Sequence, residues 1–352
     1  MPFVGPEAQE RARERRFRAR IGANESVFGP SPKAVAAMQQ AAPDCWMYAD
    51  PENYDLKRAI ARHHGVAPEN IVVGEGIDAL LGYAVRLMIE PGETVITSLG
   101  AYPTFNFHVA GFGGRLVRVP YAGDREDPQA LIETARREDA KLLYFANPDN
   151  PMGSWWGSSD VQRLIETLPG GTVLLLDEAY SDTAPADAIP PIDVSNPQVL
   201  RLRTFSKAYG LAGLRVGYAI GEANLIRAFD KIRNHFGVNR MAHVGALAAL
   251  ADQEYLHAVT NQIAEARTRI GAISRANGLE PLPSATNFVA IDCGGDGPFA
   301  KRVLDELIAR DVFVRMPGVA PLDRCIRVSA GRETDLATFA EALPNALKAA
   351  RA

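Results

Sequence analysis

The sequence predicts an α/β protein whose larger part is a mainly parallel sheet covered by helices on both faces. Short apolar runs alternate with longer amphipathic stretches from about residue 66, and this alternation is typical of strands joined by crossover helices. Helices are expected at residues 77–89 and 158–168. The expected strands are 71–73, 94–97, 116–119, 142–145, 173–176 and 199–205.

A change of pattern after Gly221 predicts a second, smaller α+β domain. Residues 223–276 are helical in pattern, and shorter strands and helices follow at 287–291, 299–310, 312–314, 326–329 and 336–348. A length of 352 residues also favours about two domains. We expect a large domain at 41–254. The small domain would join residues 1–40, which include an N-terminal arm, to 255–352.

Composition favours a cytoplasmic protein that binds neither nucleic acid nor membrane. The net charge is −4 and the pI is about 5.9, whereas nucleic-acid binding requires a basic surface. No apolar run reaches the roughly 18 residues of a membrane span, and three scattered cysteines argue against a disulfide scaffold. Six arginines lie between Arg11 and Arg20. We interpret them as a solvated helix or an arm on a partner subunit, with an anionic partner as the alternative.

Polar residues that follow consecutive strands indicate the chemistry. Asn150, Asp177 and Lys207 lie about thirty residues apart, each just after an expected strand. Ligands of open α/β sheets bind at the carboxyl ends of the strands. A cofactor whose carbonyl joins a lysine as a Schiff base needs a carboxylate for its ring nitrogen and cations for its phosphate. Arg215, eight residues after the lysine, could supply such a cation.

Five segments extend this pattern to a family resemblance. The chain resembles the class I and II pyridoxal-phosphate-dependent aminotransferases, most closely their histidinol-phosphate aminotransferase branch. The segments are TFSKAYGLAGLRVGY at 204–218, DEAY at 177–180, NPMG at 150–153, IGANE with FGPSP at 21–32, and CIRVSAG at 325–331. The resemblance implies the aspartate aminotransferase-like fold with a seven-stranded sheet, the cofactor pyridoxal 5′-phosphate, and a homodimer with shared active sites.

The resemblance also assigns roles around the cofactor ring. Lys207 would bond to the cofactor and move protons, which requires a pKa below the ordinary lysine value of about 10.4. Asp177 would hold the ring nitrogen, while Tyr180 and Asn150 would bind the phenolic oxygen. Tyr102 would stack on the ring. The residues alone leave other readings open: Asp177 as a helix N-cap, Asn150 as a turn cap and Tyr102 as a core side chain.

A second group is expected to bind the phosphate. Gly76, Ile77 and Asp78 open a helix after a strand, where backbone N–H groups and the helix dipole attract anions. The resemblance adds Thr204, Ser206, Arg215 and, from a second subunit, Tyr48. The glycines at 74 and 76 also fit a dinucleotide fingerprint loosely. That reading needs an acidic residue at the end of the next strand, and Glu93 precedes the strand instead.

The substrate side is less complete. Arg327 would clamp a carboxylate with two parallel hydrogen bonds, or form an ion pair at the domain boundary. Asn24 would lie near the substrate entrance. Arg315 would reach a distal anion or lie at the surface.

Departures from the family pattern concentrate on the same side. They are Ser26-Val27, Asp149, Met152 and His235-Phe236-Gly237. We therefore expect an aminotransferase that acts on an amino acid or on histidinol phosphate by a ping-pong mechanism, with the donor and acceptor left open. The alternatives are a related decarboxylase and a non-catalytic ligand-binding regulator. His63-His64 has no acidic partner at metal-like spacing, so no metal is expected.

Overall fold

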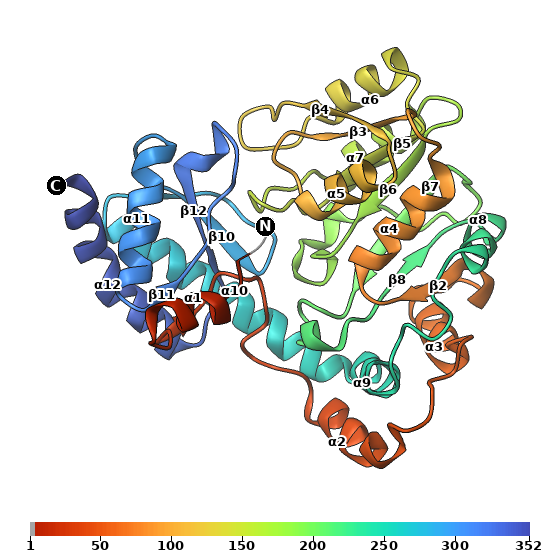
Figure 1. Cartoon of the computed structure of the whole chain (residues 1–352), viewed down its shortest axis with the longest axis horizontal. Coiled ribbons are helices and arrows are strands. Elements are labelled where there is room, and N and C mark those ends of the chain that lie inside the picture. The colour runs from red at the N-terminus through yellow and green to blue at the C-terminus, as the bar shows by residue number, and fades with distance from the viewer. Residues whose placement is uncertain (1–3) are drawn as a thin grey trace.

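A computed structural model describes residues 4–352 and contains a seven-stranded sheet in the order β2-β8-β7-β6-β5-β3-β4 (Figure 1). All seven strands run in one direction except β8, which is antiparallel to both of its neighbours. The strands are β2 (Ile71–Gly74), β3 (Thr94–Ser98), β4 (Arg115–Val119), β5 (Leu142–Ala146), β6 (Val173–Asp177), β7 (Val199–Thr204) and β8 (Gly217–Ile220).

Strand β8 was not predicted. It has four residues, starts with a glycine and returns directly beside β7, so it has neither the length nor the crossover helix of the other strands. The predicted mainly parallel, seven-stranded fold is confirmed, with this one antiparallel member.

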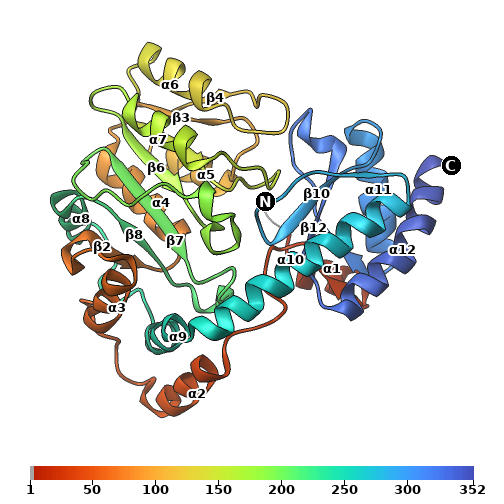
Figure 2. The ribbon, with the colours of Figure 1, turned by 180° about the vertical axis from the view of Figure 1, so that it is seen from behind.

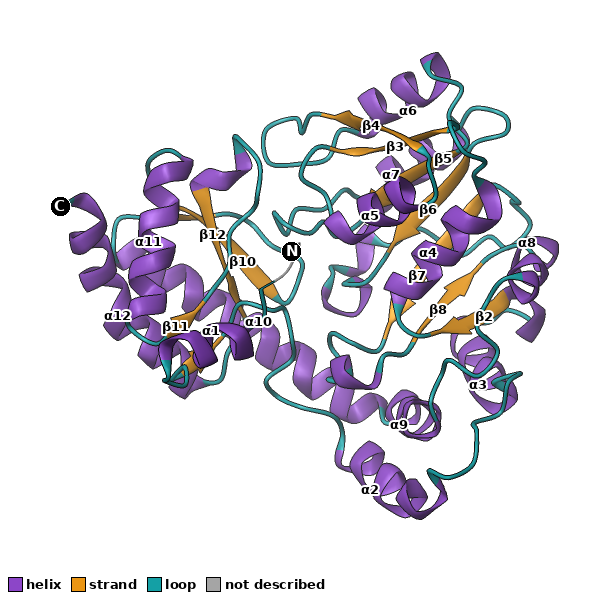
Figure 3. Ribbon diagram, in the orientation of Figure 1, coloured by secondary structure: helices purple, strands orange, loops and turns teal. Residues whose placement is uncertain are grey.

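Helices cover both faces of the sheet (Figure 3), because the strand side chains alternate in direction. Leu175 faces the cluster formed with α4 and α5, whereas Leu174 and Leu176 face α6 and α7. Helices α3 and α9 pack on the same second face, against β2 and β8. These helices are α3 (Tyr54–His64), α4 (Ile77–Met88), α5 (Pro103–Gly111), α6 (Pro128–Arg137), α7 (Ser158–Glu166) and α9 (Arg240–Ala251).

The predicted helical stretch 223–276 is three helices rather than one. It comprises α8 (Ala223–Ala228), α9 and α10 (Gln253–Ala276). Between α8 and α9 the backbone docks on the large domain: the Tyr83 hydroxyl accepts the Asn234 N–H at 3.1 Å and donates to Glu75. A Cβ on Gly237 would lie 1.5 Å from a Glu75 oxygen. Tertiary contact therefore overrides helical propensity here.

The small domain joins the two ends of the chain. Strand β1 pairs in parallel with β11, and β12-β10-β9 form an antiparallel sheet. Long α10 runs from the large domain into the small one (Figure 2). The elements are α1 (Pro6–Arg13), β1 (Ala19–Arg20), β9 (Glu280–Pro281), β10 (Phe288–Asp292), α11 (Gly297–Ala309), β11 (Val312–Phe313), β12 (Cys325–Ser329) and α12 (Glu333–Arg351).

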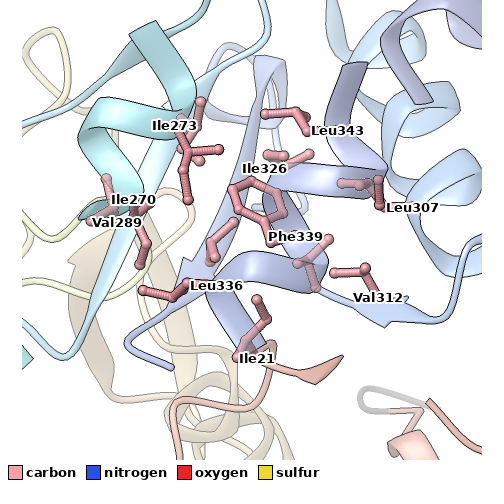
Figure 4. Packing of buried hydrophobic residues seen from close by; sticks show 14 of the residues in the cluster. Ile21, Ile270, Ile273, Val289, Leu307, Val312, Ile326, Leu336, Phe339 and Leu343 are labelled. Carbon is pink, nitrogen blue, oxygen red and sulfur yellow. The ribbon is translucent and has the colours of Figure 1, made fainter. Parts of the chain in front are cut away.

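The small-domain core draws on both chain ends. Ile21 belongs to the same buried cluster as Ile326, Phe339 and Leu343 (Figure 4). Helix α2 (Pro32–Ala41) instead packs against α9. The domain boundaries given above remain a proposal.

The arginine-rich start binds its own chain. Arg13 and Arg15 both pair with Asp311, and the Arg18 guanidinium lies 2.9 Å from Glu341. Three of the six arginines thus hold this segment on the small domain by ion pairs, and its interpretation as an arm on a partner subunit stays a prediction. In residues 4–352 no helix has the length and apolarity needed to cross a membrane.

The loop after β7 gives a testable constraint on stability. Gly210 has φ +69°, and a Cβ there would lie 2.3 Å from the Gly29 carbonyl oxygen. We expect Gly210→Ala to lower the free energy of unfolding by about 2–4 kcal/mol, from strain plus overpacking. Gly278→Ala is the matched control, because Gly278 has φ +73° with open space around it, and it should cost about 1 kcal/mol. Urea denaturation measures both, and equal losses would contradict the close approach.

Candidate active site

A cavity of about 330 Å³ lies at the carboxyl ends of β5, β6 and β7, within the size range of small-molecule sites. It brings together residues that are distant in sequence. Ten of the predicted site residues line it: Ile77, Asp78, Tyr102, Asn150, Asp177, Tyr180, Thr204, Ser206, Lys207 and Arg215.

Lys207 lies at the centre of this set. It follows β7 in a turn closed by the Gly210 N–H on the Lys207 carbonyl, and its amine lies 5.6 Å from the centre of the Tyr180 ring. Burial, helped by the Arg327 charge, lowers the pKa of Lys207 to about 8. About a fifth of the amine is therefore neutral at pH 7.4, far more than for an ordinary lysine, and a nucleophile or proton acceptor requires this neutral form.

Asp177 is the last residue of β6 and is buried in the cavity wall. Its two oxygens accept hydrogen bonds from the Tyr144 hydroxyl at 2.6 Å and the Ala179 N–H at 2.9 Å. Burial raises the pKa of Asp177 to about 6 against these two donors. It remains an anion above that pH and can bind a cationic group in the cavity.

Asn24 and Tyr180 connect the cavity to the small domain. Asn24 adopts φ +57° and donates from Nδ2 to the Tyr180 hydroxyl at 2.9 Å. Its Oδ1 accepts from Ser329 Oγ at 3.2 Å. The phenol is thus oriented by the N-terminal segment, although Asn24 itself does not line the cavity.

Arg327 lies behind Asn150, whose Oδ1 accepts a hydrogen bond from Arg327 Nη1. Burial lowers the pKa of Arg327 to about 10, and its Nε is buried without a hydrogen-bond partner among the described residues. This unsatisfied donor indicates capacity for a further anion. Arg315 is the β-bridge neighbour of Arg327 and donates to the Val4 carbonyl. Neither arginine lines the cavity directly.

The start of α4 forms an anion cradle. Gly76 is the N-cap with φ +85° and provides no side-chain cap, so the first N–H groups of the helix remain available. A Cβ there would lie 2.6 Å from Arg215 Nη2. Ser206 Oγ accepts from Arg215 Nη1 at 3.4 Å and from Thr204 Oγ1 at 2.9 Å.

This donor set fits a phosphate, because it combines a cation, two hydroxyls and a helix N-terminus. Together with a buried lysine of lowered pKa and a buried carboxylate, it fits pyridoxal 5′-phosphate. The dinucleotide reading fails, since β3 ends at Ser98 rather than at an acidic residue.

Tyr102 lies in the cavity wall, whereas Tyr48 lies on the surface. Tyr102 precedes α5, lines the cavity and donates to Asp78 at 2.8 Å. Tyr48 is outside this chain's cavity and is 78% exposed, with its ring 4.8 Å from that of Phe236. Such a side chain is available to a second subunit.

The sequence analysis missed Tyr144 and a pair of buried carboxyls. Glu126 accepts from Ser98 Oγ at 2.5 Å and from the Ala146 N–H, and it also contacts Asp149. Asp149 accepts from Tyr121 at 2.9 Å. Burial raises the pKa of Glu126 well above its usual value and that of Asp149 to about 7.

No local motif marks either feature; the contacts arise from the packing of loops after neighbouring strands. Across residues 4–352, no cluster of three or more His, Cys, Asp or Glu could hold a metal ion.

Comparisons with known proteins agree with this geometry. The model of the family "Aminotransferase class I and II" matches residues 20–343. A histidinol-phosphate aminotransferase of Moorella thermoacetica is 33% identical over 92% of this chain and 84% of its own length. A second, from Carboxydothermus hydrogenoformans, is 34% identical over 94% of this chain and 91% of its own.

Solved structures extend the likeness. Histidinol-phosphate aminotransferase from Sinorhizobium meliloti, solved in complex with pyridoxal-5′-phosphate, is 58% identical and superimposes with a TM-score of 0.97, covering 98% of this chain and 95% of that one. An aspartate aminotransferase of Thermus thermophilus, 22% identical, has a TM-score of 0.82 over 99% of this chain and all of its own. The latter confirms the predicted fold.

The buried carboxyls predict a pH dependence of stability. Above about pH 4.5 the unfolded chain has released the protons of Glu126 and Asp149, whereas the folded protein still holds them. The free energy of unfolding therefore falls as the pH rises toward the raised pKa values of these two groups. Glu126→Gln removes one such proton while preserving a donor toward Asp149. Its stability relative to wild type should therefore increase by about 1 kcal/mol per pH unit between pH 5 and 7.

Denaturant titrations at several pH values measure this difference. Glu133→Gln, an exposed carboxyl on α6, is the control and should follow wild type at every pH. Parallel curves for Glu126→Gln and wild type would show that Glu126 is ionised in the folded state.

Proposed function

Because this chain belongs to the class I and II aminotransferase family, we propose that it transfers the amino group of histidinol phosphate to a 2-oxo acid with pyridoxal 5′-phosphate. The observation that carries the proposal is the buried Lys207 of lowered pKa in one cavity with Asp177 and the Arg215 cradle. The 58% identity to the Sinorhizobium meliloti enzyme supports the choice of donor and cofactor.

The residues of the cavity divide the work of holding the cofactor. Asp177 would bind the ring nitrogen, Asn150 and Tyr180 the phenolic oxygen, and Tyr102 one face of the ring. The phosphate would lie on the start of α4 with Thr204, Ser206 and Arg215. When bound, pyridoxal phosphate supplies an electron-accepting ring that stabilises negative charge at the substrate carbon.

Lys207 would carry out the proton transfers. Its amine would hold the cofactor covalently and would accept and return protons at the substrate carbon. An amine with a pKa near 8 is suited to both directions at neutral pH.

Arg327 would hold the substrate's anionic end. Its Nε has an unused donor, and Arg315 is the adjacent positive charge. A phosphate ester and a 2-oxo acid both present an oxyanion, so one pair of arginines can serve both half-reactions.

A homodimer with shared sites belongs to the same proposal. Trp46, Tyr48 and Phe236 are large apolar side chains at 81%, 78% and 52% exposure, and a second copy would cover them. Tyr48 would reach the partner's phosphate. We also place the protein in the cytoplasm, in keeping with three free cysteines.

A spectroscopic and product assay tests the activity. Wild type with pyridoxal phosphate should develop a visible absorption band that changes on adding histidinol phosphate, and 2-oxoglutarate should then be consumed. Lys207→Ala should lack the covalent band and lose at least about a thousandfold in turnover. Lys301→Ala, a surface lysine paired with Asp305, is the control. The decarboxylase alternative is tested with an amino acid in place of histidinol phosphate, and release of carbon dioxide instead of an oxo product would favour it.

Subunit complementation tests the shared site. Lys207→Ala and Tyr48→Ala would each be nearly inactive alone. When they are unfolded and refolded together, half of the dimers are mixed, and each mixed dimer contains one intact site. Activity should recover to about a quarter of wild type. No recovery from a mixture shown to contain mixed dimers would mean that each chain builds its site alone.

A further inference from the structure

The hydrogen bonds to the carboxylate of Asp177 come from two neutral protein groups. The Tyr144 hydroxyl donates to Oδ2 at 2.6 Å and the Ala179 N–H to Oδ1 at 2.9 Å. The next residue, Glu178, differs completely, because it pairs with both Arg201 and Arg203 on the other face of the sheet. Asp177 thus keeps an uncompensated negative charge directed at the cavity, whereas the charge of Glu178 is neutralised.

The position of Tyr144 is fixed by the fold. It lies on β5, two residues before Ala146, which pairs with Asp177 of β6. Because side chains two residues apart share a face of the sheet, Tyr144 and Asp177 lie on the same face. Its ring stacks on Phe105 of α5, with ring centres 4.8 Å apart and planes 20° apart. The ring is fully buried and also lines the cavity. Its hydroxyl therefore has one orientation, toward Asp177.

We propose that Tyr144 is the positioning residue that keeps Asp177 ionised and directed into the cavity, and that it thereby sets how tightly the protein holds a protonated ring nitrogen. A short bond from a neutral hydroxyl stabilises a carboxylate without cancelling its charge. An arginine in the same place would also stabilise the carboxylate, but its positive charge would neutralise the negative charge of Asp177. The inference rests on the proposed function, since it concerns the ligand of that same site.

The charges around Asp177 define the expected pH behaviour. Asp78 on α4 disfavours its ionisation, whereas Lys207 after β7 favours it. Burial raises the pKa of Glu126 well above its usual value, so its carboxyl is neutral in this range. Tyr180, on the loop after β6, stays neutral, because burial raises its pKa. Burial also raises the pKa of Tyr144 far above its ordinary value, so Tyr144 remains a donor throughout. Removing its hydroxyl must raise the pKa of Asp177 above about 6.

Ligand binding to the apoprotein tests the proposal without an activity assay. The variant is Tyr144→Phe, and the probes are pyridoxal phosphate and its analogue in which carbon replaces the ring nitrogen. At pH 5.5 the variant should bind pyridoxal phosphate about eightfold more weakly, because a rise of about one unit in the pKa of Asp177 from about 6 lowers its ionised fraction by that factor. It should bind the carbon analogue as wild type does. The acid limb of the affinity–pH profile for pyridoxal phosphate should move upward by about one unit.

Two controls separate this role from a structural one. Tyr218→Phe deletes another buried hydroxyl, bonded to His64 at 2.8 Å on the opposite face of the sheet, and should bind both probes normally. In an Asp177→Asn background, Tyr144→Phe should cause no further loss for pyridoxal phosphate. Binding of the carbon analogue by the single Tyr144 variant shows that its cavity is folded, because that probe does not depend on the charge of Asp177.

The outcomes are distinct. Equal weakening for both probes, or unchanged affinity for pyridoxal phosphate, would overturn the inference and leave the proposed function standing. Failure of wild type to bind pyridoxal phosphate at all would overturn the proposed function and this inference with it.

Discussion

The site depends on one costly arrangement, the burial of an amine and a carboxylate in the same cavity without a direct ion pair between them. Burial disfavours both charges: it lowers the pKa of Lys207 to about 8 and raises that of Asp177 to about 6. Between those values the carboxylate is charged and the amine can still lose its proton. If the two groups formed a close ion pair, each would be stabilised in its charged form, and the amine would be neither nucleophile nor base.

The alternation of side chains along β6 and its exit keeps this arrangement separate from the structural charges nearby. Burial raises the pKa of Glu178, but Arg203 and Arg201 outweigh it, and the pKa lies below its ordinary value. That cluster holds the loop after β6 against β7 on the face away from the cavity. Adjacent carboxylates therefore serve opposite purposes: Glu178 is neutralised and anchors the loop, whereas Asp177 is left unneutralised for a ligand. A one-residue shift of register would exchange them.

Sequence reasoning found the residues that local pattern places at strand ends and missed those placed by packing. Lys207, Asp177 and Asn150 follow apolar strands directly, so the rule on strand ends was sufficient to bring them together. Tyr144 resembles any core residue of β5, and only the pairing of β5 with β6 reveals its bond to Asp177. Glu126 meets Asp149 through loop packing, which no spacing encodes. Strand β8 was not predicted because it is short and pairs with β7, the strand just before it in the sequence, so no crossover helix precedes it.

The part of the cavity around Lys207, Asp177 and Arg215 is built by the seven-stranded sheet and its loops, whereas Tyr180 and Asn150 also contact the N-terminal segment and β12. The Tyr180 phenol is oriented by Asn24, and Asn150 is held by Arg327 from β12. Arg324, three residues earlier, bridges Asp292 of the small domain and Asp124 of the large one. The ion pairs of Arg324 therefore fix the strand that carries Arg327. A movement of β12 relative to β5 would change the contact between Arg327 and Asn150, whereas Asp177, Lys207 and the start of α4 all lie on the seven-stranded sheet or next to it.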